Sequence, residues 1–297
     1  MRRFILGTDW WTDCDDVVAA RILARAHRNG EIEWLGAVLN GCMPLSVPSF
    51  DAFVRAEGLD ALPIGLDRYG TDFAGVPGSY QTLLASLGTG RSNEEAEDGV
   101  VLYRRLLANS EGKVDIVEIG FLQVAAALLE SPPDAISPLG GLALVKDKVA
   151  RFWVMAGRWD IDRGIEHNFA NNARSRSAAA AFCRLCPVPV TFLGFEIGEK
   201  VITGTGLSDE DLLKRAMVAH GSPKGRFSWD PMTAVLALAG SPEAAGYREV
   251  RGYASVDPAD GSNTFRVDPD GPHAYVVIDR DPSYYSELIE SRIRTIN

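Results

Sequence analysis

The feature that most constrains the fold of this chain is an alternation of short apolar runs with stretches of helical periodicity. Apolar runs of strand length occur at residues 4–6, 33–39, 63–66, 114–119, 152–155 and 188–193. Helical patterns lie between them at residues 16–27, 47–56, 95–107, 122–130 and 173–183. This alternation predicts an α/β fold with an open, mainly parallel sheet and helices on both of its faces.

The chain of 297 residues is long enough to bury about three quarters of its unfolded surface. No low-complexity linker or internal repeat divides it. We therefore predict a single domain over residues 1–297, with some appended structure after Gly198. A late strand at residues 275–279 and a closing helix at residues 284–294 belong to that part.

The acidic composition argues against two classes of partner. The formal net charge is −10, and an acidic surface repels nucleic-acid backbones and anionic membranes. No apolar run approaches the roughly 20 residues that span a bilayer. The first residues, MRRFILGTDWW, read as a β-strand rather than a signal peptide, because their apolar stretch is short and interrupted by Asp9. We expect a cytoplasmic protein that binds neither nucleic acid nor membrane.

The cysteines are Cys14, Cys42, Cys183 and Cys186, and the last two form a C-x-x-C pair. This spacing occurs in metal and redox sites. Here it has no second pair and no neighbouring pair of histidines, and it lies between an alanine-rich helical pattern and an apolar run. Buried free thiols are therefore the expected state.

An acidic cluster follows the first expected strand. It contains four aspartates within eight positions: Asp9, Asp13, Asp15 and Asp16. Ligands of open α/β sheets bind at the carboxyl ends of strands, and clustered carboxylates repel one another unless a cation holds them. One or two of these acids would suit a helix N-terminus, but four exceed that need. Oxygen ligands alone indicate a hard ion, calcium or magnesium.

The segment 7–16 resembles the signature of the inosine–uridine-type nucleoside hydrolases, D-T-D-x-G-x-D-x-D-D in its longer form. Gly7 replaces the first aspartate of that signature, and Trp11 replaces its glycine. The resemblance implies that Asp9 binds calcium and acts as general base toward water. It also implies that Asp15 holds a ribose hydroxyl and that Asp16 binds the metal with both oxygens. The fold implied is the open, Rossmann-like sheet of that family.

Five further motifs match the same family in the same order along the chain. In the segment VEIGFL, the carbonyl of Ile119 would bind calcium, and in SWDP the aspartate Asp230 would complete the coordination of the metal. The substrate contacts that the resemblance implies are Asn40, Met155, Glu166, Asn168 and Trp229. Asp13 receives no role from the resemblance, and helix capping is its default.

The resemblance implies calcium-dependent hydrolysis of the N-glycosidic bond of ribonucleosides, giving ribose and the free base. The partner would be a small-molecule nucleoside and the cofactor Ca²⁺, and we also expect a homo-oligomer, a dimer or a tetramer. Many relatives have a histidine before the last metal-binding aspartate. Trp229 stands there in this chain, as in a purine-preferring branch of the family. A preference for purine nucleosides is therefore expected.

Three departures from the family pattern leave an alternative open. Gly7 removes a carboxylate that supports the metal site, Trp11 is bulky, and Trp229 is a poor proton source. A degenerate member that binds metal and a ribosyl ligand without efficient hydrolysis would show such departures. Glu118 stands where the family has a small residue or proline, and it would either support the site or form a salt bridge. A phosphatase of the haloacid-dehalogenase type would need an aspartate where Trp11 stands.

Overall fold

The protein is described by a computed structural model that covers residues 1–70, 78–88 and 91–294. Its main sheet contains β1 (Arg2–Thr8), β2 (Ile32–Leu39), β3 (Ile64–Leu66), β4 (Glu97–Asp98), β5 (Val114–Glu118), β6 (Val149–Met155), β7 (Val190–Leu193), β10 (Tyr247–Val256), β11 (Asn263–Val267) and β12 (His273–Ile278). The strand order is β11-β10-β12-β7-β6-β5-β1-β2-β3-β4. Every pairing from β12 to β4 is parallel, whereas β10 runs antiparallel to both of its neighbours. The predicted, mainly parallel sheet is confirmed.

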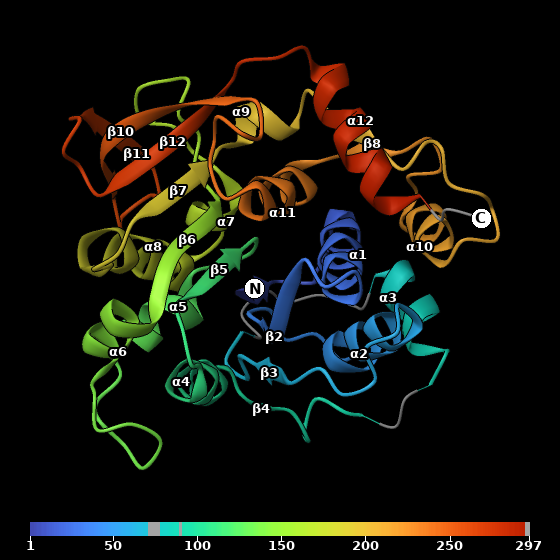
Figure 1. Cartoon of the computed structure of the whole chain (residues 1–297), viewed down its shortest axis with the longest axis horizontal. Helices are drawn as coiled ribbons and strands as arrows, with labels where there is room; N and C mark the ends of the chain where they lie inside the picture. The colour runs from blue at the N-terminus through green and yellow to red at the C-terminus, as the bar shows by residue number, and fades with distance from the viewer. Residues whose placement is uncertain (71–77, 89–90, 295–297) are drawn as a thin grey trace.

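Helices cover both faces of this sheet (Figure 1). One face packs against α1 (Asp15–Arg28), α2 (Ser46–Ala56), α3 (Ser79–Ala85), α10 (Leu212–His220), α11 (Trp229–Ala239) and α12 (Pro282–Ile293). The other packs against α4 (Gly99–Asn109), α5 (Gln123–Glu130), α6 (Gly141–Lys148) and α8 (Ala173–Leu185). Shorter elements are α7 (His167–Ala170), α9 (Phe195–Gly198) and the hairpin of β8 (Ile202–Thr203) and β9 (Arg226–Phe227). None of the described helices is long and apolar enough to cross a membrane.

The period of two along the strands separates two hydrophobic cores. Phe4 and Leu6 of β1 belong to the core beneath α1 and α11, whereas Ile5 between them belongs to the core beneath α4 and α5. On β5, Val117 belongs to the core beneath α1 and α11, and Ile116 belongs to the core beneath α4 and α5. Strands buried on both faces need apolar residues at nearly every position, which explains the continuous apolar runs of the sequence.

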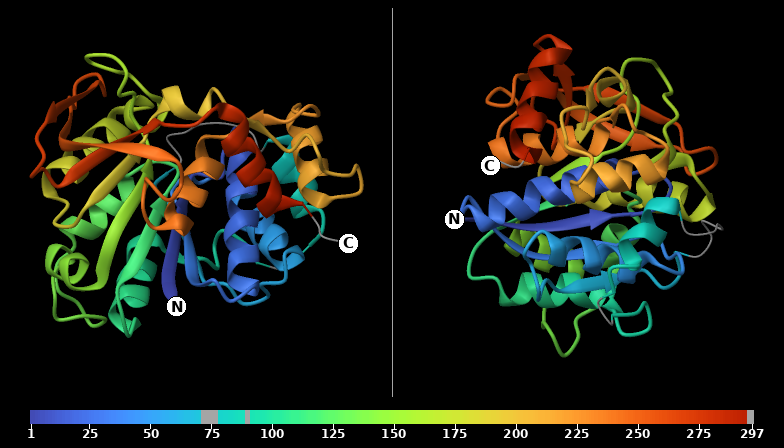
Figure 2. Two further views of the ribbon diagram at one scale, coloured as in Figure 1. Left: turned by 45° about the horizontal axis from the view of Figure 1, so that its top comes forward. Right: turned by 90° about the vertical axis from the view of Figure 1, so that its right-hand side faces the viewer.

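The order of the strands creates a crevice beside β1. The chain proceeds from β1 to β2, β3 and β4 on one side, and then returns to place β5, β6 and β7 on the other. The connections that leave β1 and β5 therefore diverge, and the carboxyl ends of these strands border the position where ligands of such sheets bind. In Figure 2, α1 (blue), α11 (orange) and α12 (red) lie side by side across one face of the sheet.

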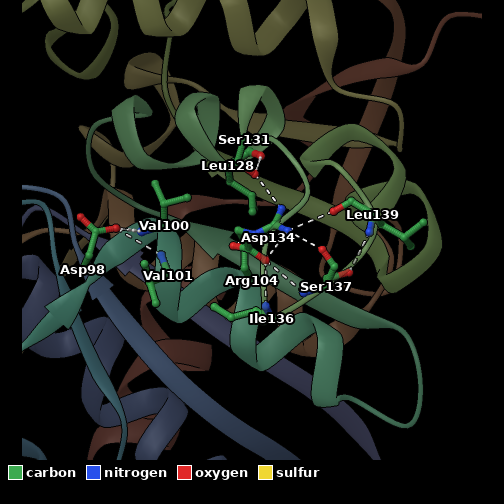
Figure 3. A network of polar contacts seen from close by, with 10 residues as sticks. All are labelled: Asp98, Val100, Val101, Arg104, Leu128, Ser131, Asp134, Ile136, Ser137 and Leu139. Carbon is green, nitrogen blue, oxygen red and sulfur yellow. Dashed lines mark hydrogen bonds and ion pairs between the residues drawn. The ribbon is translucent and has the colours of Figure 1, made fainter.

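A buried arginine fastens the loop before α6 to α4 (Figure 3). The Arg104 guanidinium donates to both carboxylate oxygens of Asp134, at 2.7 and 2.8 Å, and to Ser131 Oγ at 2.8 Å. It also donates to the carbonyls of Ser137 and Leu139. The hydrogen bonds from Arg104 lower the pKa of Asp134 to about 2. This network holds the loop in place on the side of the sheet away from α1.

The four cysteines are free thiols. Cys14, Cys183 and Cys186 are buried, and Cys42 is partly buried. Burial raises the pKa of the Cys186 thiol to about 12, and it raises the pKa of Cys183 as well. Because the thiolate is the reactive form, these two thiols are unreactive at neutral pH. The expectation of buried free thiols at Cys183 and Cys186 is confirmed.

Candidate active site

A cavity of about 280 Å³ opens at the carboxyl ends of β1, β5 and β6. Its wall is formed by Asp9, Thr12, Asp13, Asp15, Asp16, Ile119, Met155, Glu166, His167, Asn168, Phe195, Arg226, Trp229 and Asp230. Each residue that the sequence placed in the site lies on this wall except Asn40, which is buried behind it. Segments far apart in the chain thus meet in the crevice between β1 and β5.

The loop between β1 and α1 is held by hydrogen bonds to its own aspartates. The hydroxyl of Thr8 donates to Asp16, and the backbone N–H of Trp10 donates to the same carboxylate oxygen at 3.3 Å. The N–H of Trp11 donates to Asp9 Oδ1 at 3.2 Å. These bonds fix both carboxylates at the bottom of the cavity, where the strand ends and the helix begins.

The two tryptophans of this loop have different surroundings. Trp10 is fully buried, and its indole N–H donates to Ser49 Oγ at 2.9 Å, so this side chain anchors the loop in the core. It adopts a positive φ of 47°, an uncommon conformation for a bulky residue. The ring of Trp11 stacks on His167 with centroids 5.9 Å apart. Among the residues that the structure describes, the ring contacts of Trp11 include a residue of the cavity wall, whereas those of Trp10 are with Phe50, Phe53 and Tyr80.

Three buried carboxylates gather where α1 and α11 begin. Oxygens of Asp15, Asp16 and Asp230 all lie within 4.8 Å of one another. The backbone N–H of Asp230 donates to Asp15 Oδ2 at 3.1 Å, which ties the two helix starts together. Burial, and then repulsion from neighbouring aspartates that include Asp9 and Asp13, raises the pKa of each of them. Burial also raises the pKa of the nearby Asp9 to about 8.

The donor set of this cluster fits a hard divalent cation. Its side chains offer only oxygen atoms, and buried carboxylates this close to one another need positive charge to remain ionised. Arg226 lies on the same cavity wall, but its guanidinium is paired with Asp13, with 2.8 Å between Nε and Oδ1. The start of α1 has Cys14 as N-cap and no side-chain cap, so the helix-capping role expected for Asp13 is wrong.

The opposite wall presents a buried acid beside an amide. Glu166 accepts hydrogen bonds from the backbone N–H groups of Gly157 at 2.9 Å and Asn168 at 2.8 Å. The side-chain NH₂ of Asn168 donates to the carbonyl of Met155 at 2.9 Å. Burial raises the pKa of Glu166 to about 7. Glutamate and asparagine oxygens are thus held rigidly, with the capacity to accept hydrogen bonds from hydroxyl groups.

Comparisons of the sequence find no matching family model and no matching curated protein. Comparison of the structure finds a plant nucleoside hydrolase that is 16% identical to this chain. The two structures align over 98% of each chain with a TM-score of 0.73. A purine-preferring ribonucleoside hydrolase from Gardnerella vaginalis is 18% identical and also covers 98% of each chain, with a TM-score of 0.66. A type III effector protein complexed with adenosine diphosphate ribose is 17% identical over 99% of this chain and 93% of that one, with a TM-score of 0.65.

The chain has the nucleoside hydrolase fold. The fold that the sequence motifs implied is therefore confirmed, although the identity to these structures is low. Within the nucleoside hydrolase fold of this chain, the aspartates after β1, the turn after β5 and the start of α11 surround the same cavity.

One side of the cavity is aromatic. The rings of Phe195 and Trp229 stack with centroids 5.4 Å apart and an interplanar angle of 24°. The indole N–H of Trp229 donates to the carbonyl of Phe195 at 2.8 Å. The Arg226 guanidinium lies 5.6 Å from the centroid of the Trp229 ring. Because the indole N–H is already engaged, Trp229 offers a flat apolar surface and no free donor.

The wall residues missed in the sequence include Phe195 and Arg226. Phe195 follows β7, and the rule that ligands bind at the carboxyl ends of strands would have pointed to it. Arg226 belongs to the β8–β9 hairpin, which carries no strong pattern in the sequence. Asn40, which was expected to contact substrate, lies behind the cavity wall, and its side chain bonds Glu118 and the backbone N–H of Phe121.

Proposed function

We propose that this protein hydrolyses the N-glycosidic bond of ribonucleosides with the help of a calcium ion. One observation carries the proposal. The cavity combines a carboxylate cluster suited to a hard cation with a Glu166–Asn168 pair suited to sugar hydroxyls. A ribose has the vicinal hydroxyls that both groups could bind. The nucleoside hydrolase fold supports the same reaction class by analogy.

Calcium would be held by Asp9, Asp16, Asp230 and the carbonyl of Ile119, all of which line the cavity. Asp15 lies close enough to Asp16 and Asp230 to take part, in addition to the ribose contact expected of it. A calcium ion bound there would lower the pKa of a water molecule and orient the sugar.

The side chains of the chain would perform the remaining tasks. Asp9, steadied by the N–H of Trp11, would accept the proton of the attacking water as general base. Asp15, Glu166 and Asn168 would bind the ribose hydroxyls while the sugar acquires oxocarbenium-like character. The backbone contacts of Glu166 leave it little freedom, which favours a fixed orientation of the sugar.

We further propose a preference for purine bases. The ring of Trp229 and its neighbour Phe195 line the side of the cavity where a base would leave. Stacking of a base on an aromatic ring contributes about 1–3 kcal/mol, and a purine has the larger face. Because the indole N–H is engaged by Phe195, protonation of the base would fall to solvent, and a purine has the more basic ring nitrogens.

The preference is tested by comparing kcat/KM for inosine, guanosine, uridine and a riboside with an activated phenol leaving group. Trp229→Ala should reduce the preference for purines and affect the activated riboside less, because that substrate needs no proton on its leaving group. Faster cleavage of uridine than of inosine by the unaltered protein would show that the preference is absent.

A second candidate function is a binding protein that has lost turnover. The departures at Gly7 and Trp11 favour it, and the effector protein with this fold was solved with adenosine diphosphate ribose bound. Calorimetric titration of the same nucleosides, run beside a hydrolysis assay, separates the two functions. Release of base supports the hydrolase, whereas binding of a nucleoside without product from any substrate supports the binding protein.

A further inference from the structure

A buried glutamate occupies the space that a side chain on β1 would need. Gly7 and Glu118 are partners in the register between the neighbouring strands β1 and β5. A Cβ atom added at Gly7 would overlap the carboxylate of Glu118. Glu118 itself is completely buried. A side chain at position 7 would therefore have to displace the carboxylate of Glu118.

The contacts of Glu118 are polar and local. The hydroxyl of Tyr103 on α4 donates to one carboxylate oxygen, and Asn40 Nδ2 donates to the other at 3.3 Å. Within the described ranges, no arginine, lysine or histidine forms an ion pair with Glu118. The salt-bridge alternative for this residue is therefore wrong. The complete burial of an acid whose hydrogen-bond donors are both neutral is therefore not explained by an ion pair.

Asn40 links this glutamate to the cavity. Its Oδ1 accepts the backbone N–H of Phe121 at 2.9 Å, and its own N–H donates to the carbonyl of Thr8 at 2.8 Å. Gly120 lies so close to the end of β1 that an added Cβ would overlap the backbone nitrogen of Asp9. The turn that carries Ile119 is thus clamped between Asn40 and the end of β1.

We propose that Glu118 is a positioning residue of the calcium site and replaces a carboxylate from position 7. The carboxylate is supplied by β5 instead of β1. Through Asn40 it holds the turn of Ile119 against the backbone of Asp9. The departures from the family pattern at Gly7 and Glu118 are then two parts of one change, in which a carboxylate moves from β1 to the neighbouring strand β5. The inference rests on the proposed function only in taking calcium as the ligand.

The exchange is tested by moving the carboxylate back to β1. We would prepare Gly7→Asp, Glu118→Ala and the double variant, and measure calcium affinity by calorimetry and the Tm in EDTA. Glu118→Ala should weaken calcium binding by about 10–100-fold, as for other residues that orient metal ligands. Gly7→Asp alone should lower both the calcium affinity and the Tm, because the new carboxylate would overlap and repel the carboxylate of Glu118. The double variant should bind calcium more tightly than either single variant.

Two further variants separate positioning from general stability. Glu118→Gln keeps the size of the side chain and one acceptor, so it should fold and bind calcium more weakly than the unaltered protein. Asp115→Asn, on the same strand, removes a charge that pairs with Arg2 and accepts from the indole of Trp153 far from the cavity. It should lower the Tm and leave calcium affinity unchanged.

Unaltered calcium affinity in both Glu118 variants would overturn the proposal. So would a double variant that binds calcium no better than Gly7→Asp. Calcium binding that responds to Glu118 in a protein that hydrolyses no nucleoside would support this inference and reject the proposed function. Hydrolysis of a nucleoside by a protein whose calcium affinity does not change in the Glu118 variants would support the proposed function and reject this inference.

Discussion

At the scale of residues, Asp16 and Asp230 have the clearest consequences. Both are buried at the start of a helix, and their oxygens face each other and Asp15. Replacing either with alanine removes charged oxygens from the proposed calcium site, and calcium takes about six to eight oxygen ligands. We predict that Asp16→Ala and Asp230→Ala abolish calcium binding measured by calorimetry. The exposed Asp147→Ala should bind calcium normally, and stoichiometric calcium in Asp16→Ala would disprove the proposed ligands.

Asn168 allows the sugar contacts to be separated from the metal contacts. Its NH₂ group is engaged by the carbonyl of Met155, so its Oδ1 is the group for a ribose hydroxyl. Asn168→Ala should weaken nucleoside binding by about 1–3 kcal/mol, the cost of losing a buried hydrogen bond. Calcium affinity should stay unchanged in the same titrations. An equal loss of both affinities would place Asn168 among the metal ligands.

At the scale of elements, the strongly periodic segments could be predicted. The strands β1, β2, β3, β5, β6 and β7 and the helices α1, α2, α4, α5 and α8 all occur where the sequence placed them, with ends that differ by a few residues. The hairpin of β10 and β11 was missed because neither strand has an apolar run: β10 alternates buried and exposed residues over its second half, and the edge strand β11 has a single buried residue. The helix α11 was not predicted from the sequence, and Pro231 lies in its first turn, where proline is tolerated.

The N-terminus of α4 provides a test at this scale. Asp98 accepts hydrogen bonds from the backbone N–H groups of Val100 at 2.9 Å and Val101 at 3.2 Å (Figure 3). Asp98→Ala should lower the free energy of unfolding by about 1 kcal/mol, as for other N-cap residues, and Asp98→Asn should lose much less. Urea unfolding measures the difference. Equal stability of the alanine and asparagine variants would mean that the cap does not stabilise α4.

At the scale of the whole molecule, the site is assembled by topology. The sequence identified most of the cavity wall because Asp9, Ile119 and Met155 follow or end strands whose carboxyl ends meet at one edge of the sheet. It could not show that Glu118 fills the space above Gly7, because that depends on the register between β1 and β5. The positions of Arg226 and Phe195 likewise depend on how the later elements cross the sheet.

The acidic cluster is expected to couple the stability of the whole molecule to pH and to the proposed calcium ion. Burial raises the pKa of Asp9 from 3.8 to about 8, so the metal-free folded protein retains a proton that the unfolded chain would lose. Its free energy of unfolding should therefore fall as the pH rises from about 4 to about 8. Calcium would take the place of the protons, and at 100 times its Kd it adds about 2.7 kcal/mol.

Calorimetric unfolding at pH 6 and pH 8, with EDTA or with excess calcium, measures this coupling. The difference between the Tm with excess calcium and the Tm with EDTA should be larger at pH 8 than at pH 6. An equal difference in Tm at pH 6 and pH 8 would mean that calcium does not replace protons in this cluster.

The most direct test of the proposed reaction is the release of ribose and hypoxanthine from inosine in phosphate-free buffer. We expect the calcium-loaded protein to form both products in equal amounts, to stop when EDTA removes the metal and to resume when calcium returns. Asp9→Asn should bind calcium and inosine but lose most of the turnover, because it lacks the general base. Inosine that is bound by the calcium-loaded, unaltered protein and remains intact would contradict the account.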